Sequence, residues 1–152
     1  MTRSVRVVAL MGVLLCCAQG VRADSSVMGG ARLSYYTDAA APALAGELLF
    51  KLAPSIYFNP NLEVVFKDDS YITFNTDFHY DFPAGRGTLL WAGAGLAVVS
   101  VNPPGPIGGH TDAGLDLLFG VGLRRRPLIP YFQAKVIVKD QTELALGIGL
   151  RF

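Results

Sequence analysis

The sequence predicts an all-β protein, an eight-stranded antiparallel transmembrane β-barrel that follows a cleaved N-terminal signal peptide. Three observations predict this fold class. Residues 1–23 have the three parts of a secretory signal. The rest of the chain divides into eight strand-length stretches separated by turn residues. In most of these stretches apolar residues alternate with polar or small ones, which is the period-two pattern of a sheet with two different faces.

The expected signal peptide begins with a basic segment that holds Arg3 and Arg6. The apolar run 7–18 follows, and 21–23 end in a small residue at the expected cleavage site. This run is shorter than the roughly 20 apolar residues of a membrane-spanning helix. We therefore expect cleavage after Ala23, which leaves two segments, the signal peptide and the barrel.

The expected barrel, residues 24–152, contains no cysteine, because Cys16 and Cys17 both lie in the signal peptide. Its stability must then come from packing or from closure of a sheet rather than from disulfides. Without the three arginines of the leader, it has ten basic residues against twelve acidic ones. A slightly acidic chain without a basic stripe argues against a nucleic-acid partner.

The eight predicted strands have about the 9 to 11 residues, or slightly more, that a tilted transmembrane strand needs. They are residues 30–38, 44–52, 56–67, 71–82, 89–101, 111–124, 129–139 and 143–152. An even number of strands places both chain ends on the same side. The longest connection, 102–110, then falls on the opposite side, where such barrels have their longer loops.

In the first three strands the charged residues keep to one parity. Arg32 stands in the first strand, and Glu47 and Lys51 stand in the second. In the third, Glu63 and Lys67 alternate with apolar residues. Pro60 interrupts the third strand, where its missing N–H predicts either a bulge or the true start of the strand.

The fourth strand has the clearest alternation. Its first set of side chains is mostly aromatic and aliphatic, and the set between them is polar, with Asp77, His79 and Asp81 in a row. The fifth strand is apolar on both parities, so the direction of Trp91 stays open. The sixth, seventh and eighth strands again carry their charges on one parity. That parity also includes several glycines, as a narrow interior requires: Gly114, Gly120, Gly122, Gly147 and Gly149.

We predict that the charged parity faces the lumen and forms a charge network. Eight strands enclose a lumen just wide enough for side chains to fill, so balanced charges would pair and leave no open channel. Alternation alone does not distinguish inside from outside, and a soluble barrel would reverse the two faces. The predicted network comprises Arg32, Glu47, Lys51, Glu63, Lys67, Asp77, His79, Asp81, Asp112, Asp116, Arg124, Lys135, Lys139, Glu143 and Arg151.

The last strand ends in an aromatic residue after regularly spaced apolar ones. These are Leu144, Leu146, Ile148, Leu150 and Phe152. With the leader and the alternating strands, this ending resembles the small outer-membrane β-barrel proteins related to OmpA and OmpX. The resemblance covers nearly all of the expected barrel. It implies an outer-membrane location and an assembly signal, in these five residues, for the barrel-assembly machinery.

The resemblance does not select an activity, because one fold hosts many functions. We find no catalytic motif and expect a non-enzymatic role in envelope integrity or surface contact, with no cofactor or metal. A metal or acid–base role for His79 is possible, but a paired lumen histidine is the simpler interpretation. Expected partners are outer-membrane lipid and, during export, the assembly machinery and periplasmic chaperones; we expect a monomer.

Two alternative functions remain. The first is a lipid-modifying outer-membrane enzyme similar to the lipid A deacylases, which present a histidine and a serine two residues apart on a lipid-facing strand. Neither His79 nor His110 has a serine at that spacing. The second is a soluble periplasmic barrel that binds an apolar ligand inside.

Overall fold

The computed structural model describes residues 27–67, 70–85, 87–102, 109–125 and 127–152. The predicted signal peptide, with Cys16 and Cys17, lies outside these described residues. Within them, no helix is both long and apolar enough to cross a membrane.

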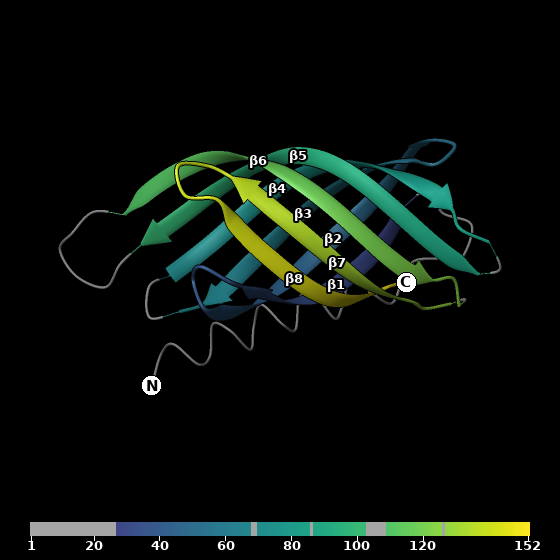
Figure 1. The fold of residues 1–152 in the computed structure, drawn as a ribbon, viewed down its shortest axis with the longest axis horizontal. Helices are drawn as coiled ribbons and strands as arrows, with labels where there is room; N and C mark the ends of the chain where they lie inside the picture. The colour runs from purple at the N-terminus through teal and green to yellow at the C-terminus, as the bar shows by residue number, and fades with distance from the viewer. Residues whose placement is uncertain (1–26, 68–69, 86, 103–108, 126) are drawn as a thin grey trace.

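All eight predicted strands are present, and each end lies within three residues of its predicted position. The strands, drawn in Figure 1, are β1 (Val27–Tyr36), β2 (Ala41–Ala53), β3 (Ile56–Phe66), β4 (Ser70–Pro83), β5 (Thr88–Asn102), β6 (His110–Leu123), β7 (Ile129–Val138) and β8 (Glu143–Arg151).

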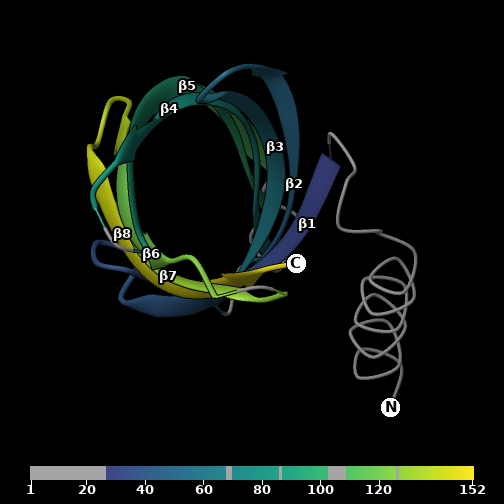
Figure 2. The same ribbon diagram turned by 90° about the vertical axis from the view of Figure 1, so that its right-hand side faces the viewer.

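The strands form one closed antiparallel barrel in chain order, and β1 and β8 pair to complete the circle (Figure 2). The β1–β8 register runs from Gly30 opposite Arg151 to Tyr36 opposite Ala145. Beyond it, Gly29 and Phe152 exchange backbone hydrogen bonds of 3.0 and 2.9 Å. Closure leaves no unpaired strand edge, which is the condition for a sheet to span a lipid bilayer.

Pro60 neither starts β3 nor causes a bulge, so both expectations for it are wrong. It lies within β3, opposite Thr76 of β4. On its other side, the β2–β3 pairing has a gap between the Glu47–Asn61 and Phe50–Phe58 pairs, as a residue without an N–H requires. The register shift of this pair lies instead between Lys51 and Ala53, at the end of β2.

The two faces of the barrel differ sharply in polarity. The outer face exposes large apolar side chains from every strand, including Leu96 at 60% and Ile148 at 61% of their full area. The inner face buries charged side chains, among them Arg32, Glu63 and Lys135. A soluble protein has the opposite arrangement, so these faces are those of a transmembrane barrel. With the closed sheet, this arrangement confirms the predicted eight-stranded antiparallel transmembrane β-barrel.

Candidate functional site in the barrel lumen

The lumen is filled by side chains in three layers along the barrel axis. We call the end with Val27 of β1 and Arg151 of β8 the terminal end, and the opposite end, with the β1–β2 and β7–β8 connections, the loop end. An apolar cluster lies toward the loop end and includes Tyr36, Tyr71 and Ile137. The middle layer is polar and charged. Toward the terminal end a second cluster comprises Leu89, Trp91, Leu118 and Tyr131.

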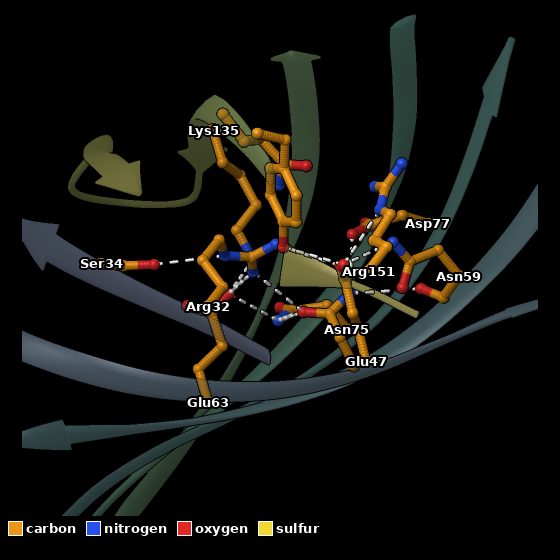
Figure 3. Close-up of polar contacts among 12 residues, drawn as sticks. Arg32, Ser34, Glu47, Asn59, Glu63, Asn75, Asp77, Lys135 and Arg151 are labelled. Carbon is orange, nitrogen blue, oxygen red and sulfur yellow. Dashed lines mark hydrogen bonds and ion pairs between the residues drawn. The ribbon is translucent and has the colours of Figure 1, made fainter. Parts of the chain in front are cut away.

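Glu63 of β3 lies in the middle layer and forms ion pairs with two cations from other strands. Arg32 Nη2 of β1 donates to Glu63 Oε1 at 2.7 Å, and Lys135 Nζ of β7 donates to the same oxygen (Figure 3). All three side chains are almost completely buried. Burial excludes water from these pairs, so each charge depends on its partners for stabilisation.

Glu47 of β2 collects donors from four strands. Its Oε1 accepts from Arg151 Nε at 3.0 Å and from the Tyr131 hydroxyl at 2.8 Å. Its Oε2 accepts from Asn59 Nδ2 at 3.1 Å and from Arg32 Nη1 at 3.5 Å. Arg32 therefore contacts both buried glutamates, and it joins the two halves of the network (Figure 3).

Arg151 connects this network to the aromatic cluster at the terminal end. Its guanidinium carbon lies 4.3 Å from the Trp91 ring centroid and 4.8 Å from that of Tyr131, within cation–π range. Trp91 is fully buried, and its indole N–H donates to Gln133 Oε1 at 3.2 Å. The Trp91 side chain, whose direction the sequence left open, therefore faces the lumen.

Lumen glycines let large side chains meet across a strand. Gly30 of β1 is paired with Glu47 on one side and Arg151 on the other. A Cβ at Gly30 would approach Glu47 Oε1 to 2.6 Å, so a larger residue would obstruct the Glu47–Arg151 ion pair. Gly149 separates Arg32 from Tyr131 in the same way. The glycines on the lumen face therefore leave the space that the network side chains occupy.

The structure brings ten of the fifteen predicted network residues into the buried lumen. They are Arg32, Glu47, Glu63, Asp77, His79, Asp81, Asp116, Lys135, Glu143 and Arg151.

The other five have the predicted parity but are not buried. Lys51, Lys67 and Arg124 are exposed, the Asp112 side chain keeps 43% of its area, and Lys139 is only partly buried. They have the lumen parity but stand at or just past the strand ends, where the interior opens to solvent. Parity fixes the direction of a side chain and not its depth along the axis.

The predicted charge balance also fails for the buried residues. In the described part of the lumen the buried basic residues are Arg32, Lys135, Arg151 and His79. In the described part of the chain the buried acids number six: Glu47, Glu63, Asp77, Asp81, Asp116 and Glu143. The balance of the full predicted set depended on lysines and an arginine that remain at the rims.

His79 lies between the Tyr57 ring and Asp81 and does not form a triad with both aspartates of its strand. Its ring stacks on Tyr57 with centroids 5.4 Å apart, and its Nε2 lies 3.3 Å from Asp81 Oδ1. Asp77 instead accepts a hydrogen bond of 2.9 Å from Asn61. In the part of the chain that the structure describes, no three histidine, cysteine or acidic side chains are arranged to hold a metal ion.

Uncharged residues that the predicted charge network does not include complete the lumen. Asn59, Asn61 and Asn75 link the acidic side chains, and the loop-end cluster includes Val65 and Val99. Val65 has the same parity as Glu63, so alternation along β3 predicts that it faces the lumen. Nothing local identifies Val99, since its strand is apolar on both faces.

The predicted assembly-signal residues divide between the outer face and the seam. Leu144, Leu146, Ile148 and Leu150 are exposed on the outside of β8. Phe152 is half-buried, and its ring lies beside Gly29 at the start of β1. The four aliphatic residues therefore belong to β8, which closes the barrel, and Phe152 directly follows it.

No protein-family model and no curated protein matches the chain. Among solved structures, the N-terminal β-barrel domain of Pseudomonas aeruginosa OprF aligns with a TM-score of 0.65 and 16% identity, over 83% of this chain and 96% of that one. Neisserial surface protein A aligns with a TM-score of 0.60 and 18% identity, over 82% and 94%. The outer-membrane enzyme PagL aligns with a TM-score of 0.56 and 13% identity, over 82% and 98%.

These similarities establish that the chain has the fold of small outer-membrane β-barrels. At such low identity they establish the fold alone. No family model assigns the chain to the OmpA and OmpX family. Both an enzyme and a surface protein have this fold, so the fold does not select a role.

Proposed function

We propose that this protein is an integral outer-membrane barrel with a closed lumen and a non-enzymatic role in envelope integrity or surface contact. The observation that carries the proposal is the reversal of faces: ion pairs such as Arg32–Glu63 lie in the dry interior, whereas the exterior is apolar. A bilayer stabilises such an exterior, and water does not.

A closed lumen follows from the position of the network. Arg32 of β1, Glu63 of β3 and Lys135 of β7 meet across the interior, and an apolar or aromatic cluster lies on each side of them. A solute would have to displace buried ion pairs to pass. We therefore infer that the barrel acts through its surfaces, namely the lipid-facing belt and the connections at the loop end.

The enzymatic alternative is supported by the fold of PagL but not by the histidines of this chain. His79 faces the lumen, away from lipid. His110 starts β6 at the loop end, where its Nε2 lies 3.4 Å from Asp112 Oδ2. Neither has the lipid-facing histidine and serine spacing of the deacylases. Unchanged lipid A acylation after overexpression would support the non-enzymatic role, and loss of acyl chains would overturn it.

The soluble alternative conflicts with the distribution of exposed apolar side chains. We propose outer-membrane lipid as the permanent partner, the assembly machinery and periplasmic chaperones as partners during export, and a monomer in the membrane. The residues proposed to bind the assembly machinery are those of β8 and Phe152.

Fractionation and conductance together test the proposal. The protein should be recovered with the outer membrane and should migrate differently on a gel before and after heating, as a folded barrel does. After reconstitution in a planar bilayer it should give no conductance steps. Recovery in osmotic-shock fluid would refute the membrane location, and regular conductance steps would refute the closed lumen.

A further inference from the structure

Two buried aspartates meet in the middle layer of the lumen without a cation of their own. Asp77 of β4 and Asp116 of β6 are paired in register with the same residue, Gly95 of β5, which lies between them. Gly95 has no side chain to separate them, and the Asp77 carboxylate lies over its Cα. Both residues are completely buried, and with only Gly95 between them they occupy neighbouring positions on the lumen face.

The donors around this pair do not satisfy it. Asp77 Oδ2 accepts from Asn61 Nδ2 at 2.9 Å. The Asn75 amide, turned with its nitrogen toward Asp116, donates to Asp116 Oδ2 at 3.2 Å. In the described part of the lumen, Oδ1 of each aspartate has no donor. A buried carboxylate oxygen without a donor is costly, so the structure requires a further positive charge or proton here.

The nearest cation is committed elsewhere. Lys135 Nζ lies 3.9 Å from Asp116 Oδ2 but donates to Glu63. The middle layer has one surplus negative charge. Its carboxylates are Glu47, Glu63, Asp77 and Asp116, and its cations are Arg32, Lys135 and Arg151. The other buried titratable groups of the described lumen are Tyr36 and Arg32 of β1, Glu47 of β2, Glu63 of β3, Tyr71, His79 and Asp81 of β4, Tyr131 and Lys135 of β7, and Glu143 and Arg151 of β8.

We propose that Asp77 and Asp116 form a proton-binding site in the lumen and share one proton at neutral pH. Two adjacent carboxyl groups in a dry site cannot both ionise at low cost, and one shared proton gives the contact its donor. The proton also removes the surplus charge of the layer. This inference depends on the closed barrel alone and not on the proposed cellular role.

A bound proton links the stability of the barrel to pH. In the unfolded chain both aspartates are ionised above pH of about 4, whereas the folded barrel keeps one proton. Unfolding then releases this proton, so stability falls as pH rises. The expected effect is an unfolding constant that increases about tenfold for each pH unit, for as long as the pair remains protonated.

The test compares the folded barrel with the D116N variant in detergent micelles. Denaturant unfolding from neutral to alkaline pH should show this slope for the unmodified barrel and for the exposed control D140N. The slope should be absent in D116N, whose amide supplies a permanent donor.

Infrared spectroscopy gives a second readout, which starts from the unmodified barrel. The folded barrel at neutral pH should show the carbonyl stretch of one protonated carboxyl group, and D116N or D77N should lose it. Absence of this band, or a slope that D116N retains, would overturn the proposal. If sodium or calcium stabilises the barrel and the band is absent, the pair holds a cation and the proton is excluded.

Discussion

Glu63 shows how one buried residue can depend on the whole barrel. Its carboxylate is contacted by Arg32 from β1 and Lys135 from β7. Both cations are buried, so water cannot take the place of the carboxylate. In such a dry network, the loss of one member leaves uncompensated charges, and this cost exceeds the net stabilisation that the ion pair contributes.

We predict that E63Q lowers the free energy of unfolding by about 3 to 5 kcal/mol, because it removes the negative charge that the buried cations Arg32 and Lys135 both contact. Urea unfolding in micelles measures this value. The control is D140N, an exposed acid in the β7–β8 connection, which should change stability by less than about 0.5 kcal/mol. Similar small effects for both variants would mean that the lumen is hydrated.

At the scale of the strands, triplets with a central glycine determine where the large lumen side chains go. Gly120 of β6 is paired with Trp91 of β5 and Gln133 of β7, and the indole crosses it to reach the glutamine. Gly122, the next lumen residue of β6, lies at the edge of the same ring, where a Cβ would come within 3.3 Å of Trp91 Cζ3.

We predict that G120A destabilises the barrel by at least about 1 to 3 kcal/mol, because its methyl group would overlap the Trp91 ring and force it to move. Trp91 is the single tryptophan, so its fluorescence reports the displacement directly. G122A is the matched control on the same strand and face, and it should leave the emission spectrum nearly unchanged. Equal spectral shifts in the two variants would contradict this packing.

The contribution of Phe152 can be separated into assembly and stability. Its backbone hydrogen bonds with Gly29 persist in F152A, so the purified barrel should refold with nearly unchanged stability. If Phe152 is part of the assembly signal, the amount of folded protein in the outer membrane should nevertheless fall severalfold. Quantifying the heat-modifiable form in cells and after refolding checks both halves. A normal cellular level would remove Phe152 from the proposed signal.

The strands were predictable because period-two alternation follows directly from the geometry of an extended chain. Glu63, Asp77 and Lys135 were placed correctly in the lumen for this reason. The depth of Lys51 and Arg124 was not predictable, since alternation is the same in the middle of a strand and at its rim. The direction of Trp91 depends on the register with Gly120, which is set by pairing between strands and is invisible in one strand alone.

For the whole molecule, closure and reversed polarity are one property. Residues such as Leu115, Leu117 and Phe119 keep more than half of their area exposed along the outside of β6, while Asp116 and Leu118 between them are buried. Only a surrounding apolar phase stabilises such an exterior, so stability should depend on the depth of each outer residue in the bilayer.

We predict that L117K, near the middle of β6, lowers the stability of the barrel in lipid vesicles by about 2 to 4 kcal/mol. The same change at Leu123, the last residue of β6, should cost about 0 to 1 kcal/mol, because a lysine there reaches the interface. Both leucines are exposed on the outer face, so burial in protein does not distinguish them. Reversible unfolding from vesicles of defined composition gives the two values. A soluble barrel would tolerate both lysines equally, whereas a difference between them means that the outer face lies in lipid.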